Sequence, residues 1–332
     1  MKPQAIVNQI LDGRPLHHVR STATAFAPTN IALCKYWGKR DEFLNLPINS
    51  SLSITLPNKG TTTTLTFCDQ SHDVIFLNQA PVDPASTFAK RLATFLDLFR
   101  TEKQFHFEVH TTSNIPIAAG LASSASGYAA LILALDQLFE WHLSKKELSI
   151  LARLGSGSAA RSIEMGFTKW YAGIAADGMD SFAEQLPYQW AELRLGLALI
   201  SEETKSISSR KAMQQTIETS PFYTLWPQKA AQDLPLLETA IAQKDFIQFG
   251  ETVESNALAM HACMLTATPP ICYFEPQTIA LMHTIWRLRK KNIPIYFTED
   301  AGPNLKLLFL AEQESLLRKE IPSLEILSPF ED

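Results

Sequence analysis

One short stretch constrains the fold of this chain more than any other. Residues 115–127, IPIAAGLASSASG, are rich in Gly, Ala and Ser and lie between a strand pattern and a helix pattern. Small side chains let a backbone approach a ligand closely, and the free N–H groups at the start of a helix favour a phosphate. The stretch lacks the Gly-Lys-Ser/Thr of a Walker A loop and the GxGxxG of a dinucleotide fold. It therefore predicts a phosphate-binding turn of another kind, with a tightly packed helix start as the plain alternative.

The surrounding patterns predict the order of strands and helices. Residues 105–110, FHFEVH, alternate between apolar and polar side chains, which indicates a strand with one solvated face. Apolar residues then recur at helical spacing from Tyr128 to Leu138, and Ser144 is a good N-cap for a second helix over 144–154. We expect further strands at 21–27, 50–56, 61–68, 73–78, 193–199 and 293–298, with 61–68 and 73–78 forming a hairpin, and helices within 210–265 and over 276–291.

The length of 332 residues is typical of about two domains. Strands mixed with helix pairs, without a regular βαβ repeat, predict an α+β fold. Residues 1–20 are interpreted as a partly amphipathic N-terminal extension. We expect one domain over 21–192 and a second over 193–332, opened by the strand at 193–199.

Charge and cysteine usage exclude several classes of protein. The net charge is −5, from 29 Lys and Arg against 34 Asp and Glu, so the chain lacks the overall basic field of a nucleic-acid binder. No apolar run approaches the roughly 18 residues of a membrane span, and the N-terminus lacks the apolar core of a signal peptide. The cysteines have no CxxC or metal-ligand spacing, so we expect free thiols in a cytoplasmic protein. They are Cys34, Cys68, Cys263 and Cys272.

Three segments carry charge where an anionic ligand could use it. Lys35 and Lys39 flank Tyr36, and the apolar neighbours of Lys35 indicate a partly buried segment in which a lysine needs a partner. A second small-residue turn ends in Arg161, which suits bidentate binding of a carboxylate or phosphate. Asp300 follows a strand pattern at a Gly-Pro turn, where a carboxylate can project outward. A solvated loop, a surface arginine and an ordinary Asx turn are the respective alternatives.

Taken together, five segments resemble the diphosphomevalonate decarboxylases of the galactokinase, homoserine kinase, mevalonate kinase and phosphomevalonate kinase superfamily. In the order expected for that family, over about residues 22 to 310, they are APTNIALCKYWGKRDEFLNLPINSSLSITL, NIPIAAGLASSASGYAAL, GSGSAARS, SSRKAMQQTIETSP and TEDAGPNLKLL. KYWGKRD and GSGSAxRS are quite specific to the decarboxylases, whereas the Gly/Ser loop is typical of the whole superfamily. The resemblance implies a two-domain small-molecule-kinase-like fold, with an N-terminal ATP-binding domain, a ferredoxin-like C-terminal domain and the active site in the cleft between them.

The resemblance also implies a reaction of the mevalonate pathway of isoprenoid biosynthesis. ATP and mevalonate 5-diphosphate would give isopentenyl diphosphate, CO₂, ADP and phosphate, with Mg²⁺. Asp300 corresponds to the catalytic aspartate, Arg161 to the arginine that holds the substrate carboxylate, and Lys35 to a lysine near the reacting centre. The implied substrate-binding residues are Tyr36, Lys39, Ser158, Ser209 and Arg210. The implied ATP-binding residues are Ala118, Ala119, Gly120, Leu121, Ala122, Ser123, Ser124 and Ser126, with Ser124 also a weak candidate ligand for magnesium. Homodimers are common in the family, and neither nucleic acid nor membrane is an expected partner.

Two alternatives keep this fold and change the reaction, namely a mevalonate 3-kinase and a phosphomevalonate decarboxylase. An inactive ATP-binding regulator is a third, from another class. The presence of Asp300, Lys35 and Arg161 together argues against the kinase and the regulator. The donors at the other end of the site favour a diphosphate over a monophosphate.

Two positions depart from the family pattern. Glu299 stands where an apolar aromatic residue is common, so it either adds an unwanted charge beside Asp300 or points away along the strand. Ala212 stands where glycine is common. The heavily anionic substrates require a cationic site, and we expect Lys35, Lys39, Arg161 and Arg210 to converge in one cleft while the acidic surplus lies elsewhere.

Overall fold

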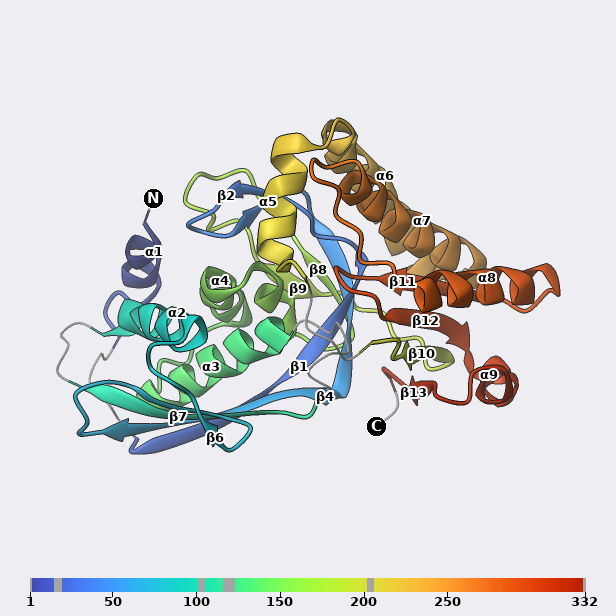
Figure 1. Ribbon diagram of the computed structural model, residues 1–332. Helices are drawn as coiled ribbons and strands as arrows, with labels where there is room; N and C mark the ends of the chain where they lie inside the picture. The colour runs from blue at the N-terminus through green and yellow to red at the C-terminus, as the bar shows by residue number, and fades with distance from the viewer. Residues whose placement is uncertain (1, 15–19, 101–104, 116–122, 202–205, 331–332) are drawn as a thin grey trace.

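The computed structural model describes residues 2–14, 20–100, 105–115, 123–201 and 206–330. Two α+β halves lie side by side, and each is built on its own sheet (Figure 1). The predicted α+β class is therefore confirmed.

A seven-stranded sheet forms the N-terminal half of the described chain. Its two longest strands, β1 (Thr22–Cys34) and β4 (Ser51–Cys68), pair antiparallel, and helix α3 (Ser123–Phe139) lies across both of them (Figure 1). The order is β6-β5-β7-β4-β8-β9, with β1 paired to β4. The other strands are β5 (Val74–Leu77), β6 (Ala80–Pro81), β7 (His106–Ser113), β8 (Phe167–Trp170) and β9 (Ala183–Gln185), and a separate ribbon is formed by β2 (Lys39–Asp41) and β3 (Leu46–Pro47).

The expected hairpin of 61–68 with 73–78 is wrong. The two expected strands at 50–56 and 61–68 are one continuous strand, β4 (Ser51–Cys68), and β7 lies between β4 and β5. The strand continues through Gly60, whose N–H donates to Asn114 Oδ1 at 2.8 Å. Short β5 instead pairs in parallel with β7 at the edge of the sheet.

A four-stranded sheet, ordered β11-β12-β10-β13, forms the C-terminal half of the described chain. Its strands are β10 (Leu193–Ala198), β11 (Ile295–Glu299), β12 (Leu305–Leu310) and β13 (Glu325–Leu327). Helices α8 (Pro276–Lys290) and α9 (Glu314–Glu320) bury apolar side chains against one face of it. Helices α6 (Trp226–Gln243) and α7 (Phe246–Leu265) belong to a different apolar cluster. The remaining helical segments are α2 (Thr87–Leu96), α4 (Lys145–Gly155), α5 (Ser209–Thr219) and the short 3₁₀ turns η1 (Asp97–Phe99), η2 (Gly157–Ile163), η3 (Tyr223–Leu225) and η4 (Ala311–Gln313).

One apolar cluster joins the two halves. Ile31 on β1 and Ile54 on β4 belong to the same buried group as Leu237 on α6, Phe249 on α7 and Leu308 on β12. Because this cluster has no boundary between the halves, it fixes the C-terminal end of β1 against the C-terminal sheet. That contact brings residues 35 and 300 together.

Ser144 forms the predicted cap at the start of helix α4. Ser144 Oγ accepts a hydrogen bond from Glu147 N–H at 3.3 Å, and Glu147 Oε2 accepts one from Ser144 N–H at 2.7 Å. This reciprocal pair satisfies two amide donors that the first turn of a helix leaves free. The predicted start of α4 is thereby confirmed.

The N-terminal segment is part of a hydrophobic core. Helix α1 (Pro3–Ile10) buries Ile6, Val7 and Ile10 in the cluster that holds α3 and α4. No helix in the described ranges is long and apolar enough to cross a membrane. The four cysteines are free thiols.

We expect Ile6→Ala to lower the free energy of unfolding by about 2–4 kcal/mol, because it removes a fully buried side chain and leaves a cavity. Gln9→Ala, at an exposed position of the same helix, is the matched control and should change it by less than about 0.5 kcal/mol. Urea unfolding of both variants measures the difference. Equal stabilities would mean that α1 is not anchored as described.

Candidate active site

The centre of the site is an ion pair between the two halves. Lys35, directly after β1, donates from Nζ to Asp300 Oδ1 at 2.8 Å and to the carbonyl of Ala32 at 2.8 Å. Asp300 directly follows β11. Thr298 Oγ1 on that strand also donates to the carbonyl of Ala32, at 3.4 Å, so β1 and β11 are linked at the same point.

Buried amides hold the backbone of Lys35. Its N–H donates to Asn256 Oδ1 on α7 at 2.8 Å, and its carbonyl accepts from Asn49 Nδ2 at 2.9 Å. Burial lowers the pKa of Lys35, and the charge and hydrogen bond of Asp300 oppose that shift. A buried lysine remains charged only with such a partner. The prediction that Lys35 lies in a partly buried segment and needs a partner is confirmed.

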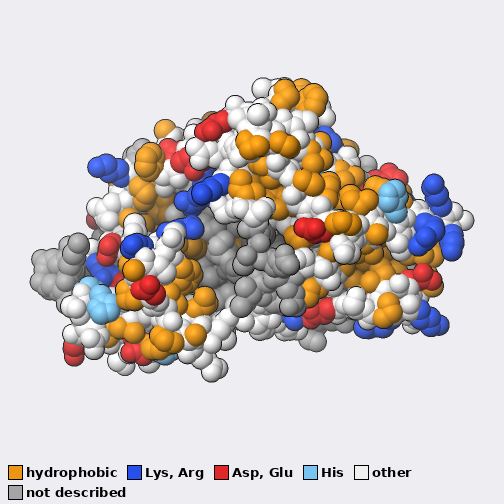
Figure 2. All heavy atoms as spheres, viewed as in Figure 1, with side chains coloured by type: hydrophobic (Ala, Val, Ile, Leu, Met, Phe, Trp, Pro, Cys, Tyr) orange, Lys and Arg blue, Asp and Glu red, His pale blue; other side chains and the backbone are white. Residues whose placement is uncertain are grey.

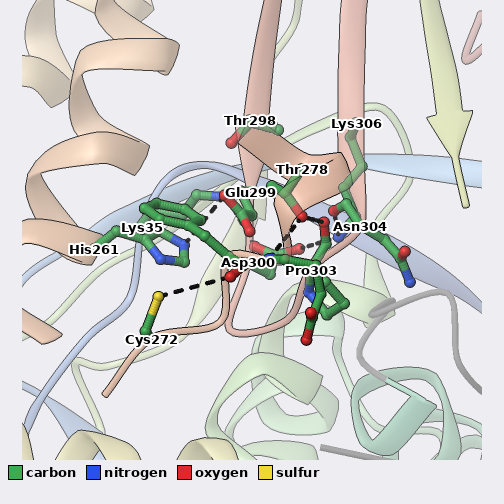
Figure 3. A network of polar contacts seen from close by, with 12 residues as sticks. Lys35, His261, Cys272, Thr278, Thr298, Glu299, Asp300, Pro303, Asn304 and Lys306 are labelled. Carbon is green, nitrogen blue, oxygen red and sulfur yellow. Dashed lines mark hydrogen bonds and ion pairs between the residues drawn. The ribbon is translucent and has the colours of Figure 1, made fainter. Parts of the chain in front are cut away.

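A second lysine reaches the same carboxylate. Lys306 on β12 is 1% exposed, and its Nζ lies 3.5 Å from Asp300 Oδ2 (Figure 3). Sequence reasoning missed this residue because it stands in the apolar run LKLLFL of a buried strand. Only the pairing of β11 with β12 places Lys306 beside the end of β11.

Arg161 is buried rather than a surface arginine. It lies in η2, where Nη1 donates to Ser51 Oγ at 2.6 Å and Nε donates to Asn30 Oδ1 at 3.2 Å. Burial lowers the pKa of Arg161 to about 10, and the nearby charge of Asp300 opposes the shift. The guanidinium therefore stays charged at neutral pH and within electrostatic reach of the aspartate.

Tyr36 lies between this centre and a second group of cations. Burial raises the pKa of Tyr36, while the charges of Arg161 and Arg210 oppose the rise. Its hydroxyl is buried and finds no hydrogen-bond partner among the described residues. Gly157 is needed here, because a Cβ at that position would lie 2.9 Å from the tyrosine hydroxyl oxygen. An orphaned hydroxyl of this kind is available to a ligand.

The second group contains Lys39, Arg91 and Arg210. Burial lowers the pKa of Lys39, and the charges of Arg210 and Arg91 add to that shift. The hydrogen bond that Lys39 Nζ donates to Glu42 Oε2 at 2.8 Å opposes it. Figure 2 shows Lys and Arg side chains gathered on this face, where Figure 1 has α2, β2 and α5. Of the four predicted cations, Lys35 and Arg161 are each within electrostatic reach of Asp300, and Lys39 is within reach of Arg210. Tyr36 is within reach of both Arg161 and Arg210. Glu42 and Arg91 were not predicted.

The serines of the predicted pockets occupy different environments. Ser124, exposed at the start of α3, has its Oγ 3.3 Å from Ser156 Oγ, which in turn lies 3.4 Å from Ser158 Oγ. Ser126 is fully buried, and its hydroxyl is 2.7 Å from Thr61 Oγ1. Ser209 is the first residue of α5. The predicted residues Ala118, Ala119, Gly120, Leu121 and Ala122 lie outside the described residues, as does the side chain of Ser123.

A cavity of about 460 Å³ lies beside the start of α3. Phe88 and Arg91 from α2, Leu77 from β5 and Tyr128 from α3 are among its mainly apolar lining. Ser124 and Gly127, from the part of the small-residue stretch that lies on α3, also line it. Nothing in the sequence pattern distinguished these residues from ordinary core residues.

Glu299 does not add a charge to the site at neutral pH. It is 1% exposed, neither carboxyl oxygen has a hydrogen-bond partner among the described residues, and Oε2 lies 3.8 Å from His261 Nε2. Burial raises the pKa of Glu299 to about 9, against the opposing charges of Lys306 and Lys35. Burial also lowers the pKa of His261 to about 3. Both groups are therefore neutral at pH 7. Ala212, the other departure, is buried inside α5.

The fold and this arrangement of cations around one carboxylate define a small-molecule-kinase-like α+β enzyme. The N-terminal model of diphosphomevalonate decarboxylase-like proteins matches residues 27–183, and the C-terminal domain model of mevalonate 5-diphosphate decarboxylases matches residues 197–324. The chain belongs to the diphosphomevalonate decarboxylase family.

Individual relatives agree over nearly the whole chain. The Aspergillus fumigatus diphosphomevalonate decarboxylase is 37% identical over 91% of this chain and 80% of its own length. The crystal structure of the Staphylococcus aureus mevalonate diphosphate decarboxylase has a TM-score of 0.87 and 36% identity, covering 93% of this chain and 95% of that one. A structure of MDDEF in complex with MVAPP, AMPPCP and magnesium has a TM-score of 0.86 and 42% identity, covering 93% and 97%.

The protonation of Glu299 gives a test through stability. In the native state its pKa is about 9, whereas the ordinary value in an unfolded chain is 4.5. The unfolded chain therefore binds fewer protons between these values, so the group makes the protein less stable as pH rises from about 5 toward 9. Glu299→Gln lacks this loss. We expect its stability relative to the parent to rise by more than about 1 kcal/mol between pH 5 and pH 8 in urea unfolding.

Glu251→Gln, at an exposed position on α7, is the control and should show no such trend. If the free energies of unfolding of the parent and Glu299→Gln differ by the same amount at every pH, Glu299 is ionised in the native state.

Proposed function

We propose that this chain catalyses the ATP-dependent decarboxylation of mevalonate 5-diphosphate to isopentenyl diphosphate, with release of ADP, phosphate and CO₂. The observation that carries the proposal is the ion pair between Asp300 and buried Lys35, which lies within electrostatic reach of buried Arg161. The chain that holds this group belongs to the diphosphomevalonate decarboxylase family. The reaction needs a proton acceptor, a cation at the transferred phosphoryl group and a holder for a carboxylate. These three residues have the required chemistry.

Asp300 is proposed to orient the tertiary 3-hydroxyl of the substrate and take its proton as the oxygen attacks the γ-phosphorus of ATP. Its side chain is 25% exposed, so the carboxylate is accessible although both of its lysine partners are buried. Phosphoryl transfer depends mainly on positioning and on cations that balance developing negative charge. Lys35 supplies one such cation.

Arg161 is proposed to hold the substrate carboxylate. When the C3–O bond breaks, phosphate leaves with the bonding electrons and carbon 3 becomes electron-deficient. The C1–C2 bond then breaks, its electron pair forms the C2=C3 double bond, and CO₂ departs. An arginine fixed by Ser51 and Asn30 can keep the carboxylate in line for this step because its guanidinium is already oriented.

Tyr36, Lys39, Ser158, Ser209 and Arg210 are proposed to bind the diphosphate end. The orphaned hydroxyl of Tyr36 and the adjacent cations Lys39 and Arg210 support this assignment. Several donors suit a diphosphate better than a monophosphate, which disfavours a phosphomevalonate decarboxylase. The complete set around Asp300 disfavours a mevalonate 3-kinase.

ATP is proposed to bind with its phosphates at residues 118–126 and its nucleoside in the adjoining cavity. The cavity is mainly apolar, and the exposed residue Ser124 is part of its lining. A cavity of this size and composition fits a nucleoside that is joined to a phosphate chain. Magnesium, when bound with the nucleotide, balances charge on the phosphate oxygens. Ser124 is the candidate protein ligand, because its hydroxyl is exposed at the start of α3.

We also propose a cytoplasmic location, a homodimer, and a domain boundary near residues 192 and 193. The free thiols agree with a reducing compartment. Light scattering of the purified protein tests the oligomeric state.

The substrate is tested by incubating the protein with MgATP and mevalonate, its 5-phosphate or its 5-diphosphate, while ADP and CO₂ are measured together. We expect equal amounts of both products with the diphosphate. ADP without CO₂ would indicate a kinase, and CO₂ from the monophosphate alone would change the substrate.

Asp300→Asn should lower kcat by about 100- to 10,000-fold, since the amide cannot accept the proton, while MgATP binding measured by calorimetry stays within about threefold. Asp69→Asn, an exposed aspartate, should leave kcat unchanged. A substantial kcat in Asp300→Asn would remove this residue from its proposed role.

Arg161→Lys keeps the charge and loses the planar fork, so we expect kcat/KM for mevalonate 5-diphosphate to fall at least about tenfold. The same change at exposed Arg287 should have no effect. A normal kcat/KM would place the substrate carboxylate elsewhere.

A further inference from the structure

Lys306 is a buried cation in an unfavourable place. It lies on β12, an interior strand paired with β11 on one side and β10 on the other, among leucines. Burying an unpaired ammonium in such surroundings is costly. A charge kept there requires a partner, and the partner indicates what the lysine does.

Strand geometry directs Lys306 to the aspartate. Lys306 pairs with Thr298 across the ladder, so both side chains lie on the same face of the sheet. Thr298 Oγ1 donates to the carbonyl of Ala32, which shows that this face meets the end of β1. From there, Lys306 Nζ donates to the carbonyl of Asn304 at 3.1 Å and lies 3.5 Å from Asp300 Oδ2.

The two lysines contact different oxygens of one carboxylate. Lys35 Nζ is 2.8 Å from Oδ1, and Lys306 Nζ is 3.5 Å from Oδ2. Rotation of the carboxyl group would lengthen at least one of these contacts. A carboxylate restrained at both oxygens has a fixed plane, which sets the direction of its remaining lone pairs.

Glu299 does not replace Asp300 as the partner of Lys306. Glu299 is a neighbour of both lysines, but it is neutral at pH 7 because burial favours its protonated form. It therefore supplies no negative charge to balance an ammonium. Figure 3 shows Lys35, Glu299, Asp300 and Lys306 in one group, with His261 beside Lys35.

We propose that Lys306 is a positioning residue, which holds the Asp300 carboxylate from the side opposite Lys35, fixes the oxygen that accepts the substrate proton and keeps the carboxylate ionised. The inference rests on the proposed function, since it assigns Lys306 to the same reacting centre. It adds a residue that acts through Asp300.

If Lys306 helps to keep Asp300 ionised, its removal should change the pH dependence of activity. The groups that face Asp300 are Lys35 after β1, Lys306 on β12, Arg161 in η2, His261 on α7 and Glu299 on its own strand. His261 and Glu299 are neutral at pH 7, so the cations act alone. A nearby ammonium favours the ionised carboxylate, and its removal raises the pH at which the carboxylate gains a proton. Activity that needs the ionised form is then lost at a higher pH.

The test compares Lys306→Met with Lys306→Arg by measuring kcat and KM from about pH 3.5 to pH 9, because the ordinary pKa of an aspartate is about 4. In Lys306→Met we expect kcat to fall about 10- to 100-fold, while the KM values stay within about threefold of the parent. We also expect the acid limb of the pH profile, where kcat falls because Asp300 gains a proton, to move up by about one pH unit. In Lys306→Arg, the charge is kept, so the acid limb should stay at its parental pH even if kcat falls. Glu299→Gln, the control beside both lysines, should keep the parental acid limb.

An unmoved acid limb in folded Lys306→Met would overturn the proposal, as would a raised KM with an unchanged kcat. If Lys306→Met does not fold, Lys306→Arg decides, and an acid limb that moves upward in that variant has the same consequence. CO₂ release by the parent enzyme shows whether a failure concerns the role of Lys306 or the proposed function. If the parent releases no CO₂ from mevalonate 5-diphosphate, the function fails, while urea unfolding of Lys306→Met, Asp300→Asn and the double variant still measures whether the two residues are coupled.

Discussion

Two buried ammonium groups share one carboxylate, and the arrangement of this protein depends on that constraint. Lys35 and Lys306 are both almost inaccessible to water; Lys35 directly follows a strand of the N-terminal sheet, and Lys306 lies on a strand of the C-terminal sheet. Burying two ammonium groups away from any anion is costly, and Asp300 is the carboxylate that both of them contact. The end of β1 and the end of β11 must therefore meet, and the apolar cluster around Ile31 and Leu308 holds them in that position.

Two adjacent carboxyl groups at this point lie in opposite environments. Asp300 is partly exposed and contacts two lysines, whereas Glu299 is buried and has no hydrogen-bond partner in the described part of the chain. Like charges so close would repel, and burial determines which group loses its charge. The departure from the family pattern therefore leaves a single anion at the centre, because the second acid is kept neutral.

Sequence patterns predicted many of the helices and strands, because interactions between residues near in sequence determine where these elements begin and end. The capping pair at Ser144 and the alternation in β7 depend on residues near in sequence. The false hairpin arose because strand order depends on distant pairing, and β7 follows β5 in sequence but separates it from β4. The cations of Lys35 and Arg161 were predicted from motifs. Lys306 was not, because one lysine in an apolar strand gives no signal until its neighbouring strand is known.

The apolar cluster that crosses the junction also has a consequence for the energetics of the whole molecule. Residues of β1 and β4 share a continuous buried surface with α6, α7 and β12, so neither half can lose its structure without exposing apolar area of the other. The free energies of the halves are thereby coupled through the junction. The reacting centre is built at that junction, so its geometry should be lost together with the apolar contacts of the cluster.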